Sequence, residues 1–264
     1  MKLLRCVPRH QVSHQEALSP LPFAALNPDN TISLVQESAG IFVLAPQKTP
    51  LTDVALLPPV IPGKIVAVGL NYREHAAETA AKLPSEPLLF LKPPSAVIGP
   101  GAAIILPPMS KRVDHEGELA VVIGKTIKDV SPEQAKGAIL GYTCGNDVTA
   151  RDLQAKDRQW TRAKSFDTFC PLGPWIETEL EPSNLRLECR VNGQVRQKGA
   201  TKDMVFGVYE LLSFISRVMT LSPGDVILTG TPAGISALKE GDIVEVEIEG
   251  LGVLSNPVRA ASSQ

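Results

Sequence analysis

The run of sequence that says most about the fold is His115-Glu116-Gly117-Glu118-Leu119-Ala120-Val121-Val122-Ile123-Gly124. From Glu118 onward it is apolar and rich in β-branched residues, which predicts a strand in the centre of a sheet. Residues two apart in an extended chain share a face, so Glu116 and Glu118 point the same way and His115 points the other way. Gly117 leaves the space beside the two carboxylates open.

Two adjacent carboxylates repel each other unless a cation lies between them. The apolar run that follows carries the pair into the core rather than into solvent. Glu-x-Glu pairs are also common on solvated surfaces, so this pair alone does not establish a metal site. It becomes informative only together with other polar segments of the chain.

Outward from this strand, short apolar runs predict further strands, and helices are few. Helix-start residues occur at Ser131-Pro132-Glu133-Gln134, and apolar residues recur near the helical period over 208–219. The 23 prolines and 20 glycines imply many turns. These patterns predict an α+β, mostly β protein. The further strands are expected at 64–69, 88–92, 103–106, 139–144, 185–191, 226–229 and 243–248.

The first 58 residues differ from the rest. Short apolar pieces at 32–34 and 41–44 are broken by polar residues and proline, and a proline-rich connector around Pro58 and Pro59 follows. We therefore expect a small β-rich N-terminal subdomain at 1–58 and a larger domain at 59–264.

The composition indicates a soluble folded protein. The apolar fraction is 44%, the charged fraction 20%, and the formal net charge −2, which gives no sign of a nucleic-acid surface. Four cysteines lie far apart without a Cys-x-x-Cys pair, as expected in a reducing compartment. No apolar run approaches a membrane span, and the N-terminus lacks the apolar region of a secretory signal. We expect a cytoplasmic protein that contacts no membrane.

Three more segments concentrate polar residues. In 145–154, Asp147 could supply a third carboxylate at a strand end, with Arg151 and Gln154 on the helix face that follows; a helix N-cap at Asp147 is the alternative. Lys164 precedes an apolar run, and a buried lysine needs a negative partner, although a surface lysine is the common case. His75 lies three residues before Glu78, a spacing that can orient an imidazole as a base but is frequent on exposed helices.

Taken in order, these segments and the stretch at 221–234, LSPGDVILTGTPAG, resemble the fumarylacetoacetate hydrolase family. The similarity extends from about residue 63 to 258 and is strongest to the short-chain branch, which includes acylpyruvases, oxaloacetate decarboxylases and tautomerases, and isomerases of homoprotocatechuate breakdown. The resemblance implies a mixed β-sandwich roll, a homodimer, and a catalytic role for the domain at 59–264. Many relatives have Arg before the Asn-Tyr pair, where this chain has Leu70.

The resemblance also implies roles for particular residues. The metal, Mg²⁺ or Mn²⁺, would be bound by three carboxylates, those of Glu116, Glu118 and Asp147. The catalytic residues would be His75, Glu78 and Lys164. The substrate-binding residues would be Asn71, Tyr72, Arg151, Gln154 and Thr231.

The resemblance predicts a divalent-metal-dependent enzyme for a small 2-oxo or 2,4-dioxo acid, acting through a metal-bound enolate. The first expectation is cleavage of a C–C bond, by acylpyruvate hydrolysis or oxaloacetate decarboxylation. The alternative is an isomerase or tautomerase of 2-oxo-hept-3-ene-1,7-dioate or oxaloacetate, and a non-catalytic ligand-binding homologue is a remote one. The alanine-rich segment 71–83 buries little apolar area, so we also expect it to move as a lid.

Overall fold

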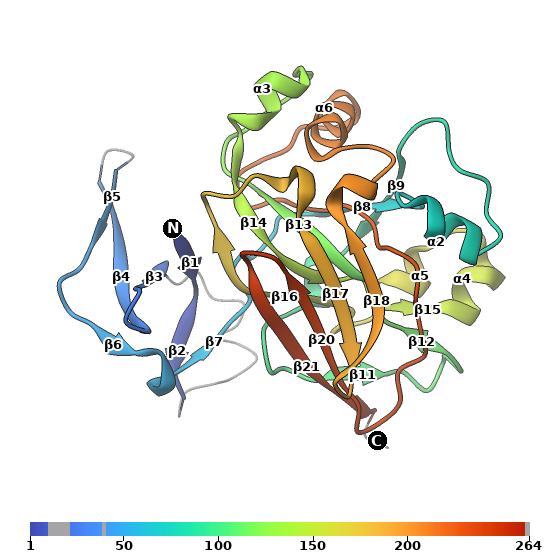
Figure 1. Cartoon of the computed structure of the whole chain (residues 1–264), viewed down its shortest axis with the longest axis horizontal. Helices are drawn as coiled ribbons and strands as arrows, with labels where there is room; N and C mark the ends of the chain where they lie inside the picture. Colours follow the sequence, from blue (N-terminus) through green and yellow to red (C-terminus); the bar gives the residue numbers. More distant parts are fainter. Residues whose placement is uncertain (10–21, 39–40, 262–264) are drawn as a thin grey trace.

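The computed structural model describes residues 1–9, 22–38 and 41–261. The protein is mostly β with a few short helices, which confirms the predicted fold class (Figure 1). Most of its strands belong to a large sheet and a second sheet. The large sheet has the order β5 (Ile41–Leu44), β4 (Thr31–Ser38), β3 (Ala24–Leu26), β1 (Lys2–Leu4), β16 (Cys170–Glu177), β14 (Ile139–Asn146), β13 (Gly117–Ile123), β19 (Val226–Leu228), β8 (Ile65–Gly69) and β9 (Leu88–Lys92), with β10 (Val97–Ile98) beside β16 and β6 (Thr49–Pro50) beside β4.

The second sheet lies against the first and has the order β11 (Ile104–Leu106), β21 (Gly252–Ala260), β20 (Ile243–Ile248), β17 (Arg186–Val191) and β18 (Gln194–Ala200). Two small ladders pair β12 (Val113–Asp114) with β15 (Thr149–Ala150), and β2 (Cys6–Pro8) with β7 (Val54–Leu56). The helices are α2 (Arg73–Glu78), α3 (Pro132–Lys136), α4 (Arg151–Asp157), α5 (Thr161–Lys164) and α6 (Val208–Val218), with 3₁₀ turns η2 (Leu51–Asp53), η3 (Pro94–Ala96), η4 (Pro182–Asn184) and η5 (Thr201–Asp203).

Strand β13 lies in the middle of the large sheet, as its apolar sequence predicts. Every residue of it is buried, and it pairs with β14 on one side and β19 on the other. Leu119, Val121 and Ile123 pack into the core between the sheets, whereas Ala120 and Val122 pack into a second core on the opposite face. Burial on both faces explains why the run is continuously apolar rather than alternating.

The two predicted helix signals are confirmed. Ser131 caps α3 with a complete capping box, in which its hydroxyl accepts a bond from the Gln134 backbone and the Gln134 side chain accepts one from the Ser131 backbone. Helix α6 covers most of the segment predicted from periodicity, and its Leu211, Leu212 and Ile215 are fully buried.

The N-terminal strands extend the large sheet. Strand β1 pairs antiparallel with β16, with Leu3 opposite Ile176, and β3 and β4 follow outward (blue in Figure 1). Leu3 and Ile176 belong to the same buried cluster. The division at residue 58 stays a prediction. Over the part of the chain described here, no helix has the length and apolarity needed to cross a bilayer.

Candidate metal and proton-transfer site

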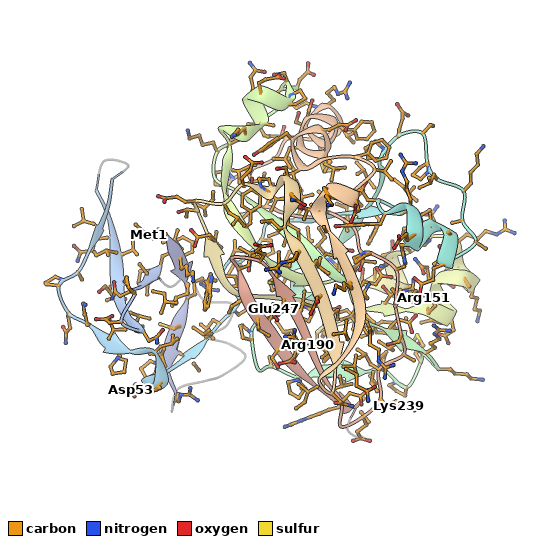
Figure 2. All side chains as sticks on the ribbon, in the orientation of Figure 1. Met1, Asp53, Arg151, Arg190, Lys239 and Glu247 are labelled. Atoms are coloured by element: carbon orange, nitrogen blue, oxygen red, sulfur yellow. The ribbon has the colours of Figure 1, made fainter. Side chains whose placement is uncertain are left out.

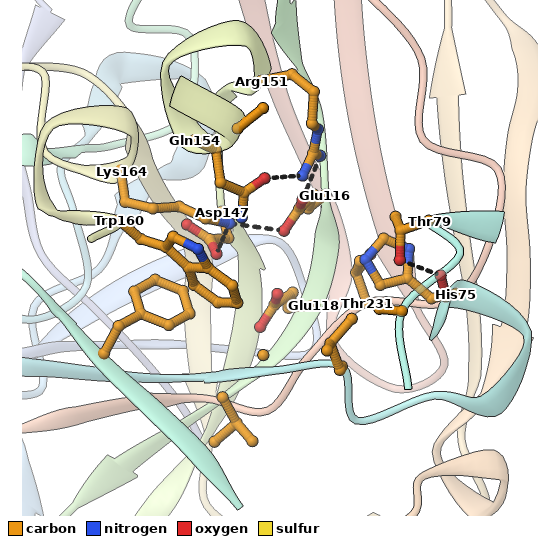
Figure 3. A pocket seen from close by; sticks show the side chains of 16 residues that line it. His75, Thr79, Glu116, Glu118, Asp147, Arg151, Gln154, Trp160, Lys164 and Thr231 are labelled. Atoms are coloured by element: carbon orange, nitrogen blue, oxygen red, sulfur yellow. Dashed lines mark hydrogen bonds and ion pairs between the residues drawn. The ribbon is translucent and has the colours of Figure 1, made fainter. Parts of the chain in front are cut away.

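Three acidic side chains meet where β13 begins and β14 ends. Glu116 and Glu118 flank Gly117 at the start of β13, and Asp147 follows the last residue of β14 (Figure 3). One carboxylate oxygen from each lies within 4.8 Å of the others, and all three residues are buried. A backbone bond of 2.8 Å from the Asp147 amide to the Glu116 carbonyl fixes the two strand ends together. The arrangement agrees with the predicted carboxylate triad.

The three carboxylates differ in electrostatic environment. Burial, together with the charges of Asp147 and Glu116, raises the pKa of Glu118 well above its usual range. Burial acts in the same direction on Glu116, but Lys164 and Arg151 outweigh it and lower the Glu116 pKa. A cation among the three carboxylates would offset the neighbouring negative charges that act on Glu118.

Lys164 bridges two of the acids. It ends helix α5, its ammonium lies 2.9 Å from Glu116 Oε2 and 2.5 Å from Asp147 Oδ2, and its side chain is 2% exposed. Burial favours the neutral amine, but the charges of Asp147 and Glu116 outweigh it and raise the Lys164 pKa. The position agrees with the buried, carboxylate-paired lysine predicted from sequence.

A second buried lysine completes the cluster and was missed by the sequence analysis. Lys92, the last residue of β9, lies 2.6 Å from Asp147 Oδ1 and is fully enclosed. Asp147 is thus held by an ammonium on each oxygen. A signal was present, because Leu88, Phe90 and Lys92 share one face of a predicted strand, and a lysine on that face needs a partner.

Arg151 and Gln154 enter the site from helix α4. Arg151 Nη2 donates to Glu116, its Nε donates to Asp114 Oδ2 at 3.0 Å, and its Nη1 donates to Gln154 Oε1 at 2.6 Å. Helix α4 begins after Ala150 without a side-chain cap, so the alternative that Asp147 caps this helix is wrong. Asp147 is instead free to face the other carboxylates.

The predicted His75–Glu78 pair lies on α2, opposite the carboxylates. His75 Nδ1 is 3.2 Å from Glu78 Oε2, and the backbone amide of Gly234 donates to Glu78 Oε1 at 3.0 Å. His75 is 5% exposed, so its ring is held inside the protein rather than on an exposed helix face. The loop of residues 229–234 thereby orients Glu78, and Glu78 orients the imidazole.

The same loop supports the carboxylates. Gly230 N donates to Glu118 Oε2 at 2.7 Å, and Thr231 Oγ1 donates to the Gly117 carbonyl at 2.8 Å. The buried Gln197 donates to Thr231 Oγ1 at 2.7 Å and accepts from Gly117 N at 2.9 Å. Gln197 is a further residue that the sequence analysis missed, because nothing in its strand predicts which loop it meets.

These side chains line one cavity of about 340 Å³, a volume typical of small-molecule sites. Of the predicted residues, Asn71, Tyr72 and Glu78 do not line it. Asn71 is fully buried and bonds to the backbone of Phe206 and Thr229, and Tyr72 is 2% exposed. Contact of Asn71 and Tyr72 with substrate stays a prediction. The predicted residues that line the cavity are Glu116, Glu118, Asp147, His75, Lys164, Arg151, Gln154 and Thr231.

The donor set fits a hard divalent cation. Oxygen ligands from carboxylates are those that Mg²⁺ and Mn²⁺ prefer, and the triad offers one oxygen from each residue within 4.8 Å of the others. Burial, and after it the charges of Asp147 and Glu116, raises the pKa of Glu118, so its charged form is disfavoured without a cation nearby. Two lysines and an arginine offset part of that charge, so a bound cation would not be the sole source of neutralisation.

Comparison with known proteins decides the family. Residues 64–259 match the family described as Fumarylacetoacetate (FAA) hydrolase C-terminal. The chain belongs to the fumarylacetoacetate hydrolase family. This match covers the second, larger part of the chain and includes every predicted site residue. It confirms the family resemblance seen in the sequence.

Similar proteins within the fumarylacetoacetate hydrolase family include a human protein named oxaloacetate tautomerase FAHD2A, mitochondrial. It is 46% identical over 222 residues, which are 79% of this chain and 71% of that protein. A crystal structure of a 5-carboxymethyl-2-hydroxymuconate delta-isomerase from Mycobacterium smegmatis is 45% identical, with a TM-score of 0.88 over 100% of both chains. A 2-hydroxyhepta-2,4-diene-1,7-dioate isomerase from Mycobacterium marinum is 44% identical, with a TM-score of 0.87 over 100% of both chains.

Proposed function

We propose that this protein is a divalent-metal-dependent enzyme that transfers a proton at carbon 3 of a small 2-oxo acid, as a tautomerase or isomerase. One observation carries the proposal: the carboxylate triad and the His75 imidazole line the same cavity of about 340 Å³. An acidic cluster suited to a cation therefore faces a proton-carrying group. The names of the related tautomerase and isomerases support this choice of reaction class.

The triad would bind Mg²⁺ or Mn²⁺. When bound, such an ion acts as a Lewis acid that polarises a carbonyl. Lys164 adds a fixed positive charge beside Glu116 and Asp147. The keto oxygen of a 2-oxo acid bound at the triad would lie near this charge. A preorganised charge of this kind is typically worth about 10²–10³ in rate.

His75 is the proton carrier in this proposal. Glu78 occupies Nδ1, so Nε2 is the ring nitrogen left to exchange a proton in the cavity. The proton on carbon 3 moves to His75, and its bonding electrons form an enolate on the 2-keto oxygen. Return of the proton to oxygen gives the enol, and return to another carbon of a conjugated substrate gives the isomer. General-base help of this type contributes about 10²–10⁴.

Cleavage of a C–C bond, the first expectation from sequence, stays a prediction. In hydrolysis of an acylpyruvate, His75 would deprotonate a water that attacks carbon 4, and the C3–C4 bond would break to leave an acid and the enolate of pyruvate. In decarboxylation of oxaloacetate the same bond would break without that water, which releases CO₂ and also leaves the enolate of pyruvate. Products separate the three outcomes: pyruvate with a second acid, pyruvate with CO₂, or a compound of unchanged formula.

Proton exchange at carbon 3 tests the proposed function directly. Oxaloacetate and other 2-oxo acids are incubated with the enzyme in D₂O and followed by proton NMR. We expect exchange that requires Mg²⁺ or Mn²⁺, stops with a chelator, and falls about 10²-fold or more in His75→Ala. Arg73→Ala, an exposed position on the same helix, is the matched control and should keep the activity. Metal-independent exchange, or full activity in His75→Ala, would contradict the proposal.

A further inference from the structure

One side of the cavity is an apolar wall, formed by Leu70, Phe90 and Trp160. Leu70 follows β8, Phe90 lies on β9, and Trp160 lies between α4 and α5. Figure 3 shows the Trp160 indole beside Lys164 and Asp147. The Phe90 and Trp160 rings meet edge to face with centroids 5.2 Å apart. A Cβ atom at Gly69 would lie 2.6 Å from a Trp160 ring carbon, so the indole packs directly on the strand end. The wall is therefore fixed by packing.

The basic groups near this wall are already paired. Lys164 bonds two carboxylates and lies 5.0 Å from the Phe90 ring centroid. Arg151 uses its guanidinium on Asp114, Glu116 and Gln154. The remaining basic side chain among the described cavity-lining residues is His75, which pairs with Glu78.

A 2-oxo acid whose carboxylate and keto group face the triad would place its other end against the apolar wall, where no unpaired basic side chain lines the described cavity. A second carboxylate placed against the apolar wall would lose its water without gaining a cation, which is unfavourable. A branched alkyl or aromatic group there would instead bury apolar surface.

Resting on the proposed function, we infer that the physiological substrate is a 2-oxo monoacid with an apolar distal group, selected by the wall of Leu70, Phe90 and Trp160. The related proteins whose names carry dioates or oxaloacetate would then differ from this chain in substrate.

Two acids of similar size test the selection. 4-Methyl-2-oxopentanoate and 2-oxoglutarate share the 2-oxo acid head and an exchangeable methylene at carbon 3, but end in an isopropyl group and a carboxylate. The kcat/KM for exchange at carbon 3 is measured for each with saturating Mg²⁺. We expect the apolar acid to be favoured by about tenfold or more. Equal values, or a preference for 2-oxoglutarate, would overturn the inference.

A charge placed in the wall should shift this preference. Leu70→Arg offers a guanidinium that can bind a carboxylate through two bonds, and we expect it to move the ratio toward 2-oxoglutarate by about 10–100-fold. Leu70→Met is the matched control and should keep the ratio within about threefold. Leu70 has φ 58°, and both variants keep an L side chain there, so they share the same backbone cost. An unchanged ratio in a folded Leu70→Arg protein would contradict a wall role for Leu70.

Binding provides a readout that does not depend on turnover. In a Trp175→Phe protein, Trp160 is the remaining tryptophan of the two. We expect 4-methyl-2-oxopentanoate with Mg²⁺ to change the fluorescence of Trp160 at a concentration at which 2-oxoglutarate leaves it unchanged. The same change with 2-oxoglutarate would count against the inference.

The proposed function and the apolar selection can fail separately. If 2-oxoglutarate and oxaloacetate exchange faster than the apolar acid, the proposed function stands and the apolar selection falls. If none of the three exchanges at carbon 3, the proposed function falls and the selection falls with it.

Discussion

Lys164 shows how one ammonium can serve both folding and chemistry. Its Nζ bonds Glu116 and Asp147 inside the protein, so Lys164→Met leaves two buried carboxylates with less positive charge. We expect the free energy of unfolding to fall by about 3–5 kcal/mol in a chelator. Saturating Mg²⁺ should recover part of this loss, since a cation neutralises the same oxygens. Calorimetry with and without Mg²⁺ measures both values.

With metal saturating, we expect Lys164→Met to lower kcat by about 10²–10³. Lys198→Met is the control, because the Lys198 side chain is 77% exposed and lies 3.6 Å from Glu188. It should change the unfolding free energy by less than about 1 kcal/mol. A Lys164→Met protein with wild-type kcat would remove the lysine from the reaction.

Single residues were predictable where the local pattern constrains them. Glu116 and Glu118 share a face at the start of an apolar strand, and that alone gave their convergence. Asp147 and Lys164 needed the family resemblance, since Asp147 could equally cap a helix and a lysine such as Lys164 is commonly on the surface. Lys92 and Gln197 were missed because their partners, Asp147 and Thr231, are distant in sequence and meet them only in the folded chain.

At the scale of elements, α2 is held at its start by Asn71. This side chain donates to the carbonyls of Thr229 and Phe206 at 2.7 and 3.1 Å and accepts from the Phe206 amide at 2.9 Å. We expect Asn71→Ala to destabilise the protein by about 1–3 kcal/mol, because buried backbone groups lose their partners. His75 should lose its alignment as well, so kcat should drop by about tenfold or more.

Thermal unfolding and steady-state kinetics of Asn71→Ala check both effects. Arg73→Ala, two residues further on the exposed side of α2, should change neither. Unaltered kcat in Asn71→Ala would mean that the position of His75 does not depend on this anchor.

The segment predicted to move as a lid includes the rest of α2. Helix α2 has six residues, of which His75 and Ala76 are buried, and Glu78 meets Gly234. A helix this short is marginal by itself. We expect backbone amide hydrogen exchange over 73–82 to slow when Mg²⁺ and oxalate are added, while exchange in β13 stays unchanged. Equal protection of 73–82 in both states would contradict closure.

Helices and strands lie where the sequence predicts them wherever the pattern of apolar residues is clear. The strands β13 and β20, the capped helix α3 and helix α6 lie close to where their patterns place them. The pairing order was not predictable, because β13 lies between β14 and β19, and only β14 is its neighbour in sequence. The spacing of apolar residues predicts whether a segment is a helix or a strand, whereas the strands that pair with it depend on the packing of the whole chain.

For the whole molecule, we expect a homodimer, as the sequence resemblance to the family implies. Exposed apolar side chains such as Leu88 and Leu91, 40% and 50% exposed, lie on β9 at an end of the large sheet. Burying such positions against a second copy would stabilise the assembly. Light scattering at micromolar concentration should give twice the mass of the 28.2 kDa chain. A monomer under those conditions would refute the expectation.

The described N-terminal strands share a buried apolar cluster with the rest of the large sheet. Leu3 on β1 is fully buried and lies opposite Ile176 of β16, and both belong to one apolar cluster that also contains Leu228. The N-terminal strands also have a small buried cluster of their own, against which Trp175 of β16 packs; it consists of Leu4, Ala24, Ile32 and Val54. Because the larger cluster joins β1 to the rest of the large sheet, we expect the two parts to unfold together. We expect Leu3→Ala to destabilise the whole protein by about 2–5 kcal/mol. The temperature at which activity is lost should fall by about 5–15 °C.

Leu34→Ala is the matched control, since Leu34 lies on β4 in the same N-terminal region but is 53% exposed. It should leave the melting temperature almost unchanged. Calorimetry of both variants, with activity measured along the same temperature ramp, separates the two views. One transition that shifts together with activity in Leu3→Ala supports a single cooperative unit. Two separate transitions, with Leu3→Ala lowering only the one at which activity is kept, would establish the N-terminal segment as an independent subdomain. The domain that carries the site would then keep its activity without the strand that β1 adds to its sheet.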